Sequence, residues 1–386
     1  MTEMVFGTAP TQSVDPVLPR WWRTLDKWTL TCVLGLFAVG LLLGLAASPP
    51  LAQRNELAEF HYVKRQMFFG SLALLVMVFV SMQSVATVRR LSILGFAGAM
   101  VALMLLPVLG TDFGKGATRW YSLGFVSVQP SEFLKPVFVV TAAWLMAAGA
   151  STGISGRLAS FMLTMLVVAF LVVQPDFGQS ALVLFSWGVM WFVSGASVVL
   201  LVSLGVTVIV GGVLAYSTSE HFARRIDGFL APEVDPTTQL GYAAGAIQNG
   251  GFLGVGVGEG TVKWQLPDAH TDFIIAVAAE EYGLLLVIPV IALFCTVVVR
   301  SLGRLMRERD DFVRLAGTGL ACSFGVQAII NMGVAVRLLP AKGMTLPFVS
   351  YGGSSLIAGG FAIGALLALT RYRPQGELSD ILRGRT

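Results

Sequence analysis

The amino-acid sequence predicts an all-α, polytopic integral membrane protein, and three observations lead to this fold class. The 386 residues are 55% hydrophobic and only 12% charged, whereas a soluble domain carries about 25% charged residues. The mean hydropathy is +0.77. The apolar segments are long and helical, while a membrane β-barrel would show alternating segments of about 10 residues.

Ten segments are candidates for membrane helices, since each approaches the ~20 apolar residues that a helix needs to span a bilayer. They are residues 28–48, 66–85, 91–110, 133–149, 158–173, 180–195, 197–216, 273–299, 313–336 and 352–370. We expect one transmembrane domain over residues 28–372, between tails at 1–27 and 373–386. A large extracytoplasmic loop, residues 217–271, is expected between the seventh and eighth helices.

Short basic clusters fall in alternate connections, and the positive-inside rule places those connections in the cytoplasm. The clusters hold 15 of the 26 Lys and Arg residues, namely Arg20, Arg23, Lys27, Arg89, Arg90, Arg157, Arg300, Arg304, Arg307, Arg309, Arg314, Arg371, Arg373, Arg383 and Arg385. We therefore expect a protein of the cytoplasmic membrane with both termini in the cytoplasm. The same distribution explains the pI of about 9.1 without a nucleic-acid partner.

Other classes of protein lack support in the sequence. No cleavable signal peptide is visible in residues 1–27, which are polar and lead straight into the first candidate helix. Cys32, Cys295 and Cys322 fall in apolar runs without paired spacing, so we expect neither a disulfide framework nor a zinc site. The chain has only three histidines, which argues against a metal centre built from histidine.

The most distinctive polar residues lie on the opposite side, in residues 49–65, 111–132, 174–179, 217–271 and 337–351. A carrier tends to place its ionisable groups near the bilayer midplane on broken helices. Here they crowd one interface instead. This distribution favours chemistry on an amphiphilic substrate at the outer leaflet.

The stretch QLPDAHTDFIIAVAAEEYG delivers His270, Thr271 and Asp272 to the start of an apolar run. Asp272 lies at the expected boundary between water and lipid, where its structural alternative is a helix N-cap. Glu280 and Glu281 lie inside the apolar run. Two ionised carboxylates facing lipid would be costly, so we expect this pair to face the bundle interior in a structural role.

The connection before the fourth candidate helix contains Arg119 and the motif QPSEFLKP. Glu132 and Lys135 are three residues apart on one helical face, close enough to pair. The functional interpretation is that Arg119 and Lys135 supply positive charge to a diphosphate while Glu132 holds the lysine. The structural alternative is an interfacial ion pair with a lysine that extends toward water.

Two further connections contain turn residues. In QPDFGQ, Asp176 is either a turn former or a functional carboxylate near membrane depth, where an unpaired charge would be costly. The run QNGGFLGVGVGEG contains no nucleotide-binding glycine motif. We expect its glycines to allow close backbone approach to a bulky headgroup, or simply flexibility.

The last polar stretch, LPAKGMTLPFVSYGGSS, supplies Lys342, Ser350 and Ser354 as candidate substrate-binding residues. The alternative is a helix start, with serine as a cap and glycine for helix packing. Serines without a suitable His–Asp set do not indicate a hydrolase.

Five motifs follow one another along the chain: QPSEFLKP, QPDFGQ, QNGGFLGVGVGEG, LPDAHTDFIIAVAAEEYG and LPAKGMTLPFVSYGGSS. Together they resemble the SEDS family of polytopic cell-wall proteins over about residues 28–373. The form AKGMTLPFVSYGGSS resembles the division members of the family more than the elongation members. Asp268, where the family often has Glu, and Arg337, where a small residue is common, depart from the pattern.

The resemblance implies a peptidoglycan glycosyltransferase that polymerises lipid II, an undecaprenyl-linked disaccharide pentapeptide, at the outer face of the cytoplasmic membrane. Asp272 would be the essential carboxylate and general base, and undecaprenyl diphosphate the leaving group, in an inverting reaction. Arg119, Glu132, Lys135, Asp176, His270, Thr271, Lys342, Ser350 and Ser354 would contact substrate. No dedicated metal cage is visible, so a divalent cation (Mg²⁺ or Mn²⁺) is optional.

The implied partners are a class B penicillin-binding protein (an FtsI-like transpeptidase), other divisome membrane proteins and membrane lipids, at the division septum. A lipid II flippase and a non-catalytic divisome scaffold are the alternatives. The crowding of charge at one interface favours the enzyme.

Overall fold

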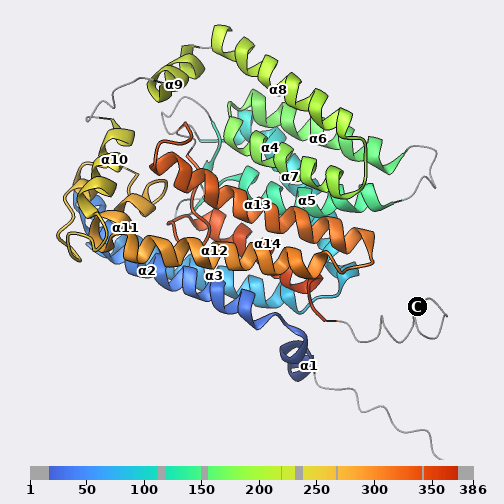
Figure 1. Ribbon diagram of the computed structural model, residues 1–386, viewed down its shortest axis with the longest axis horizontal. Coiled ribbons are helices and arrows are strands. Elements are labelled where there is room, and N and C mark those ends of the chain that lie inside the picture. Colours follow the sequence, from blue (N-terminus) through green and yellow to red (C-terminus); the bar gives the residue numbers. More distant parts are fainter. Residues whose placement is uncertain are drawn as a thin grey trace, which may run out of the picture.

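The computed structural model describes residues 17–111, 118–122, 124, 126–148, 155–218, 220–230, 238–266, 268–340 and 343–372. Its described part is a bundle of helices with one small β-hairpin (Figure 1). The all-α fold class predicted from the sequence is confirmed.

The helices of the first half are α1 (Val17–Thr24), α2 (Lys27–Arg54), α3 (His61–Ser81), α4 (Val85–Leu109), α5 (Pro130–Ala147), α6 (Gly156–Val173) and α7 (Phe177–Val193). Strands β1 (Tyr121–Ser122) and β2 (Ser127–Val128) pair antiparallel just before α5. The second half contains α8 (Val198–Thr218), α9 (Glu220–Leu230), α10 (Gln239–Gly250), the 3₁₀ turn η1 (Val262–Trp264), α11 (Ile274–Tyr282), α12 (Leu284–Leu305), α13 (Asp311–Ala335) and α14 (Gly353–Leu369).

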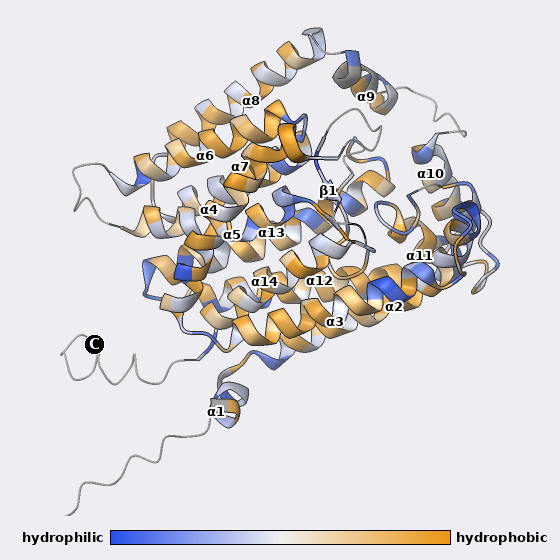
Figure 2. Ribbon diagram, turned by 180° about the vertical axis from the view of Figure 1, so that it is seen from behind, coloured by the Kyte–Doolittle hydropathy of each residue, from blue (hydrophilic) through white to orange (hydrophobic). Residues whose placement is uncertain are grey.

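Seven helices in the described part are long and apolar enough to cross a membrane: α2, α3, α4, α6, α8, α12 and α13. The chain is therefore a multi-pass membrane protein. Helices α7 and α14 are apolar but shorter. Each of the ten candidate segments contains helix, and the number that crosses the membrane stays a prediction. Apolar residues predominate along the long helices (Figure 2), as helices that span a membrane require.

The eighth candidate segment, residues 273–299, is not one helix as predicted. It breaks at Gly283, whose φ of 67° lies in the left-handed region that favours glycine. The segment before α11 replaces the lost helical bonds, because Leu284 N–H donates to Gly251 O at 3.2 Å and Leu285 N–H to Phe252 O at 3.1 Å. Periodicity misses this break, since membrane helices tolerate glycine.

The connection 217–271 is largely structured, because α8 extends to Thr218 and α9, α10 and η1 follow. Two of its glycines allow close backbone approach to α11, and approach of the run to a headgroup stays a prediction. A Cβ atom on Gly250 would lie 1.8 Å from Ala279 O, and one on Gly254 would lie 2.2 Å from Glu281 O. The glycine-rich run therefore packs backbone against backbone.

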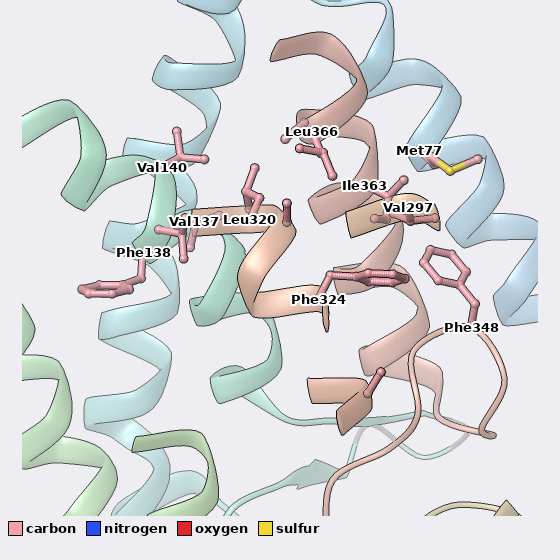
Figure 3. Close-up of a cluster of buried hydrophobic side chains, with 14 of the residues drawn as sticks. Met77, Val137, Phe138, Val140, Val297, Leu320, Phe324, Phe348, Ile363 and Leu366 are labelled. Atoms are coloured by element: carbon pink, nitrogen blue, oxygen red, sulfur yellow. The ribbon is translucent and has the colours of Figure 1, made fainter. Parts of the chain in front are cut away.

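The core lies where α3, α5, α12, α13 and α14 meet (Figure 3). The rings of Phe324 and Phe348 lie 6.4 Å apart between centroids. Phe348 belongs to the connection between α13 and α14, residues 336–352, which we call the α13–α14 connection. Packing of Phe348 among these helices anchors that connection against the bundle.

The two described ends of the chain meet at one end of the bundle (Figure 1). Tyr372 N–H donates to Thr24 O at 3.1 Å. Asp26, 1% exposed, forms ion pairs with Arg300 at 2.8 Å and Arg304 at 3.3 Å. These contacts join α1, α2, α12 and α14 at the end opposite α10 and α11.

Candidate functional site

A cavity of about 550 Å³ collects the connections that the sequence predicts on the outer face. Seven predicted site residues line it: Arg119, Glu132, Asp176, His270, Thr271, Asp272 and Ser354. They come from segments more than 200 residues apart in the chain, between 119 and 354. Lys342 lies outside the described residues. Lys135 and Ser350 are placed behind the cavity wall, as described below.

The backbone around Asp272 is held from three sides. Ser350 Oγ donates to Thr271 O, and Tyr351 N–H donates to His270 O at 2.9 Å. Asn331 Nδ2 donates to Asp272 O at 2.9 Å. Ser350 thus supports the cavity wall from within the protein, where it is 1% exposed.

Helix α11 begins at Ile274, and its N-cap position is Phe273. The N-cap alternative for Asp272 is therefore wrong by one residue. Asp272 instead belongs to a turn in which its own N–H and that of Thr271 both donate to Asp268 O, at 3.1 and 3.2 Å. This turn presents the Asp272 side chain at the wall of the cavity.

Glu132 and Lys135 form the predicted ion pair, with Nζ and Oε2 2.8 Å apart and both side chains 7% exposed. Glu132 Oε1 also accepts from Gln179 Nε2 at 2.6 Å, and Lys135 Nζ donates to Gln327 Oε1 at 3.0 Å. Lys135 borders a second, smaller cavity of about 40 Å³, whereas Glu132 lines both. The lysine therefore sits one layer behind the larger cavity.

Arg119 and Asp176 are brought together at the turn between α6 and α7. The Arg119 guanidinium donates to Gln174 O at 3.1 Å and Pro175 O at 2.8 Å. Asp176 accepts from Ser131 Oγ at 3.3 Å and is 6% exposed. Burial raises the pKa of the Asp176 carboxyl, and the nearby Arg119 charge opposes that rise.

His270 packs in a cluster of aromatic rings at the cavity. Its ring lies 5.2 Å from that of Tyr62 and 5.5 Å from that of Tyr351, between centroids. Tyr62 also meets Tyr351 edge to face at 5.6 Å. These contacts hold the ring of His270, the residue directly before Thr271 and Asp272, in place.

Glu280 and Glu281 face η1 and the interior, and neither lines the larger cavity. Glu280 Oε1 accepts from the backbone N–H groups of Thr261 and Val262 at 2.9 and 3.1 Å. Glu281 forms a buried ion pair with Lys263. Each carboxylate thus has a partner that compensates for its burial.

Sequence reasoning missed Arg65, Gln239, Thr345 and Tyr351 as cavity residues, and treated Asp268 only as a departure from a family pattern. Tyr351 and Thr345 lie in the motif LPAKGMTLPFVSYGGSS, where Lys342, Ser350 and Ser354 were already candidates for substrate binding. Arg65 gave a weaker signal, a single cation at the end of residues 49–65. In the described part of the chain, no three or more His, Cys, Asp or Glu side chains gather to hold a metal ion.

Fold and site together define a multi-pass membrane protein with a polar, charged cavity at one end of an apolar bundle. The chain belongs to the FtsW/RodA/SpoVE family, described as cell cycle protein, which matches residues 27–375. It is 41% identical to the probable peptidoglycan glycosyltransferase FtsW of Caulobacter vibrioides over 359 residues, covering 92% of each chain. The protein of the same name from Trichlorobacter lovleyi is 34% identical, with 89% of this chain and 93% of the relative covered.

Solved structures give the same result. One, from a study of polymerization and crosslinking by a peptidoglycan synthase complex, is 28% identical with a TM-score of 0.75, covering 90% of this chain and 99% of the other. The rod shape determining protein RodA of Thermus thermophilus is 25% identical with a TM-score of 0.63, over 91% of this chain and 99% of RodA.

Proposed function

We propose that this protein is a peptidoglycan glycosyltransferase of cell division that polymerises lipid II into glycan strands. The names of its relatives support the activity. The main support is the position of Asp272 at the wall of a charged cavity, in a backbone segment, residues 270–272, whose three carbonyl groups each accept a hydrogen bond from another part of the protein. A carboxylate on a backbone that is held in place in this way suits a general base.

In the proposed reaction, Asp272 accepts the proton of the acceptor sugar 4-hydroxyl while that oxygen attacks the anomeric carbon of the donor. The bond from the anomeric carbon to the diphosphate oxygen breaks, and undecaprenyl diphosphate leaves. Direct displacement inverts the anomeric centre. The carboxyl then releases its proton to water in the cavity.

Arg119 lines the larger cavity close to Asp176, so we assign it to the charge that develops on the leaving diphosphate. Lys135 lies behind Glu132 and acts through that ion pair and through Gln327. Lys342 stays a candidate for substrate contact on the strength of its motif alone.

A divalent cation, Mg²⁺ or Mn²⁺, is an optional part of the proposal. The described residues offer no group of three metal-ligating side chains, so diphosphate oxygens would be its main ligands, together with Asp176, a carboxylate of the wall close to Arg119. When bound, the cation would offset charge on the leaving group.

We further propose that the protein works at the septum with a class B penicillin-binding protein, an FtsI-like transpeptidase. The likeness to a chain from a study of polymerization and crosslinking by one complex supports such a partner. The basic clusters support a cytoplasmic location for both termini, with the cavity at the outer face of the cytoplasmic membrane. Other divisome membrane proteins are further partners in this proposal.

A lipid II flippase and a scaffold are the competing functions, and one experiment distinguishes the enzyme from both. Labelled lipid II is supplied in detergent, where there is no second leaflet, to the protein purified with its transpeptidase. An enzyme makes glycan polymer, detected after gel separation. A folded complex that binds lipid II and makes none would contradict the proposal.

A further inference from the structure

Helix α13 carries two buried amide side chains, Gln327 and Asn331, which we call the α13 amide pair. They are four residues apart, so they lie on one face, one helical turn from each other. A buried amide is costly in a membrane helix unless it is hydrogen-bonded, and leucine would fill the same space without that cost. The pair therefore needs a reason beyond packing.

Asn331 joins two segments of the cavity wall. Its Nδ2 donates to Asp272 O at 2.9 Å and to Met344 O at 2.6 Å. Two carbonyl acceptors require a nitrogen here, which fixes how the amide is turned. Among the described residues, its Oδ1 is left buried without a hydrogen-bond partner. A residue chosen for stability alone would avoid that cost.

Gln327 binds the same segment from one helical turn earlier on α13. Its Nε2 donates to Thr345 O at 3.0 Å, and its Oε1 accepts from Lys135 Nζ at 3.0 Å. Lys135 in turn pairs with Glu132. Gln327 thus links the ion pair on α5 to the α13–α14 connection, one residue from the bond that Asn331 makes at Met344.

The α13 amide pair thus binds both the turn that contains Asp272 and the α13–α14 connection, and these two segments meet at the carboxylate of Asp272. A Cβ atom on Gly343 would lie 3.5 Å from Asp272 Oδ2, so this carboxylate borders the α13–α14 connection. A shift of either backbone would therefore change where the carboxylate points. Misplacing a reacting group by about 1 Å costs on the order of 100-fold in rate.

We infer that Gln327 and Asn331 are positioning residues that fix Asp272 against the α13–α14 connection and the Glu132–Lys135 pair. Helix α13 acts as the common reference to which these three parts are bonded. The kinetic part of this inference rests on the proposed glycosyltransferase function. The geometric part, the tethering of residues 270–276 to α13, is independent of it.

The test compares Asn331→Leu, Gln327→Met and a control, Ile329→Ala, in the full-length protein with its transpeptidase. Ile329 is on the same helix but 61% exposed, away from the site. We expect Asn331→Leu to lower kcat for lipid II polymerisation by about 100-fold while KM changes little. Gln327→Met should give a smaller loss of the same kind, and Ile329→Ala none.

Hydrogen exchange measured by mass spectrometry supplies a readout that does not depend on activity. We expect faster exchange at the backbone amides of residues 270–276 and 344–351 in Asn331→Leu, with protection of α6 and α7 unchanged. Should Asn331→Leu fail to accumulate, Gln327→Met decides by the same two measurements.

Unchanged kcat together with unchanged exchange would overturn the inference. A loss of protection throughout the bundle would also overturn it, because the pair would then serve general stability. If the wild-type protein makes no polymer while the local exchange result holds, the proposed function fails and the tethering stands.

Discussion

The geometry of the buried ion pair between Glu132 and Lys135 predicts how much free energy of unfolding is lost when one partner is replaced. At the observed 2.8 Å, two unit charges attract by about 6 kcal/mol at an effective dielectric constant of about 20. Removing both charges from water offsets much of that attraction. Removing one partner leaves the other charge buried, so Lys135→Met alone should lower the free energy of unfolding by about 3–5 kcal/mol.

The double variant Glu132→Gln with Lys135→Met leaves no buried charge at this position. We expect its loss to be about 2–3 kcal/mol smaller than the sum of the two single losses. Unfolding is followed by helical signal during titration with SDS in mixed micelles, for the wild type, both single variants and the double variant. Losses that add to within about 0.5 kcal/mol would show that the two charges do not stabilise each other.

Three further substitutions test other parts of the structure. Arg119→Lys cannot reproduce the forked bonds to Gln174 O and Pro175 O, so kcat/KM for lipid II should fall by about 10-fold. Asp26→Asn weakens the pair with Arg300, so the free energy of unfolding should fall by about 1–3 kcal/mol and the thermal midpoint should fall with it. Polymerisation per folded molecule should stay unchanged. Gly283→Ala would place a Cβ atom 2.3 Å from Phe252 O at positive φ, so it should destabilise more than Gly205→Ala, whose Cβ meets no heavy atom within 4 Å.

The sequence predicted the helical framework well because long apolar runs and their polar boundaries are local properties of the chain. The Glu132–Lys135 pair was also predictable, since a spacing of three residues on a helix fixes the distance between side chains. In the same way, the ordered motifs indicated which connections contain the site. Seven of the predicted site residues do line one cavity.

What the sequence could not supply depends on contacts between distant segments. The break at Gly283 depends on carbonyl groups of Gly251 and Phe252, which no helical pattern reveals. The close approach of Gly250 to α11 likewise requires a partner backbone about 30 residues away. Asn331 was visible as a polar residue in an apolar helix, but its two acceptors become known only when the chain is folded.

Asp272→Asn removes the carboxylate that acts as the base in the proposed reaction and keeps the size of the side chain. The matched control is Asp311→Asn, the same change at a side chain that is 64% exposed at the start of α13. Both variants and the wild type are purified with the transpeptidase, checked for equal thermal midpoints, and given labelled lipid II. We predict polymer from the wild type and from Asp311→Asn, and none from Asp272→Asn. Polymer formed by Asp272→Asn at the wild-type rate would show that Asp272 is not the general base.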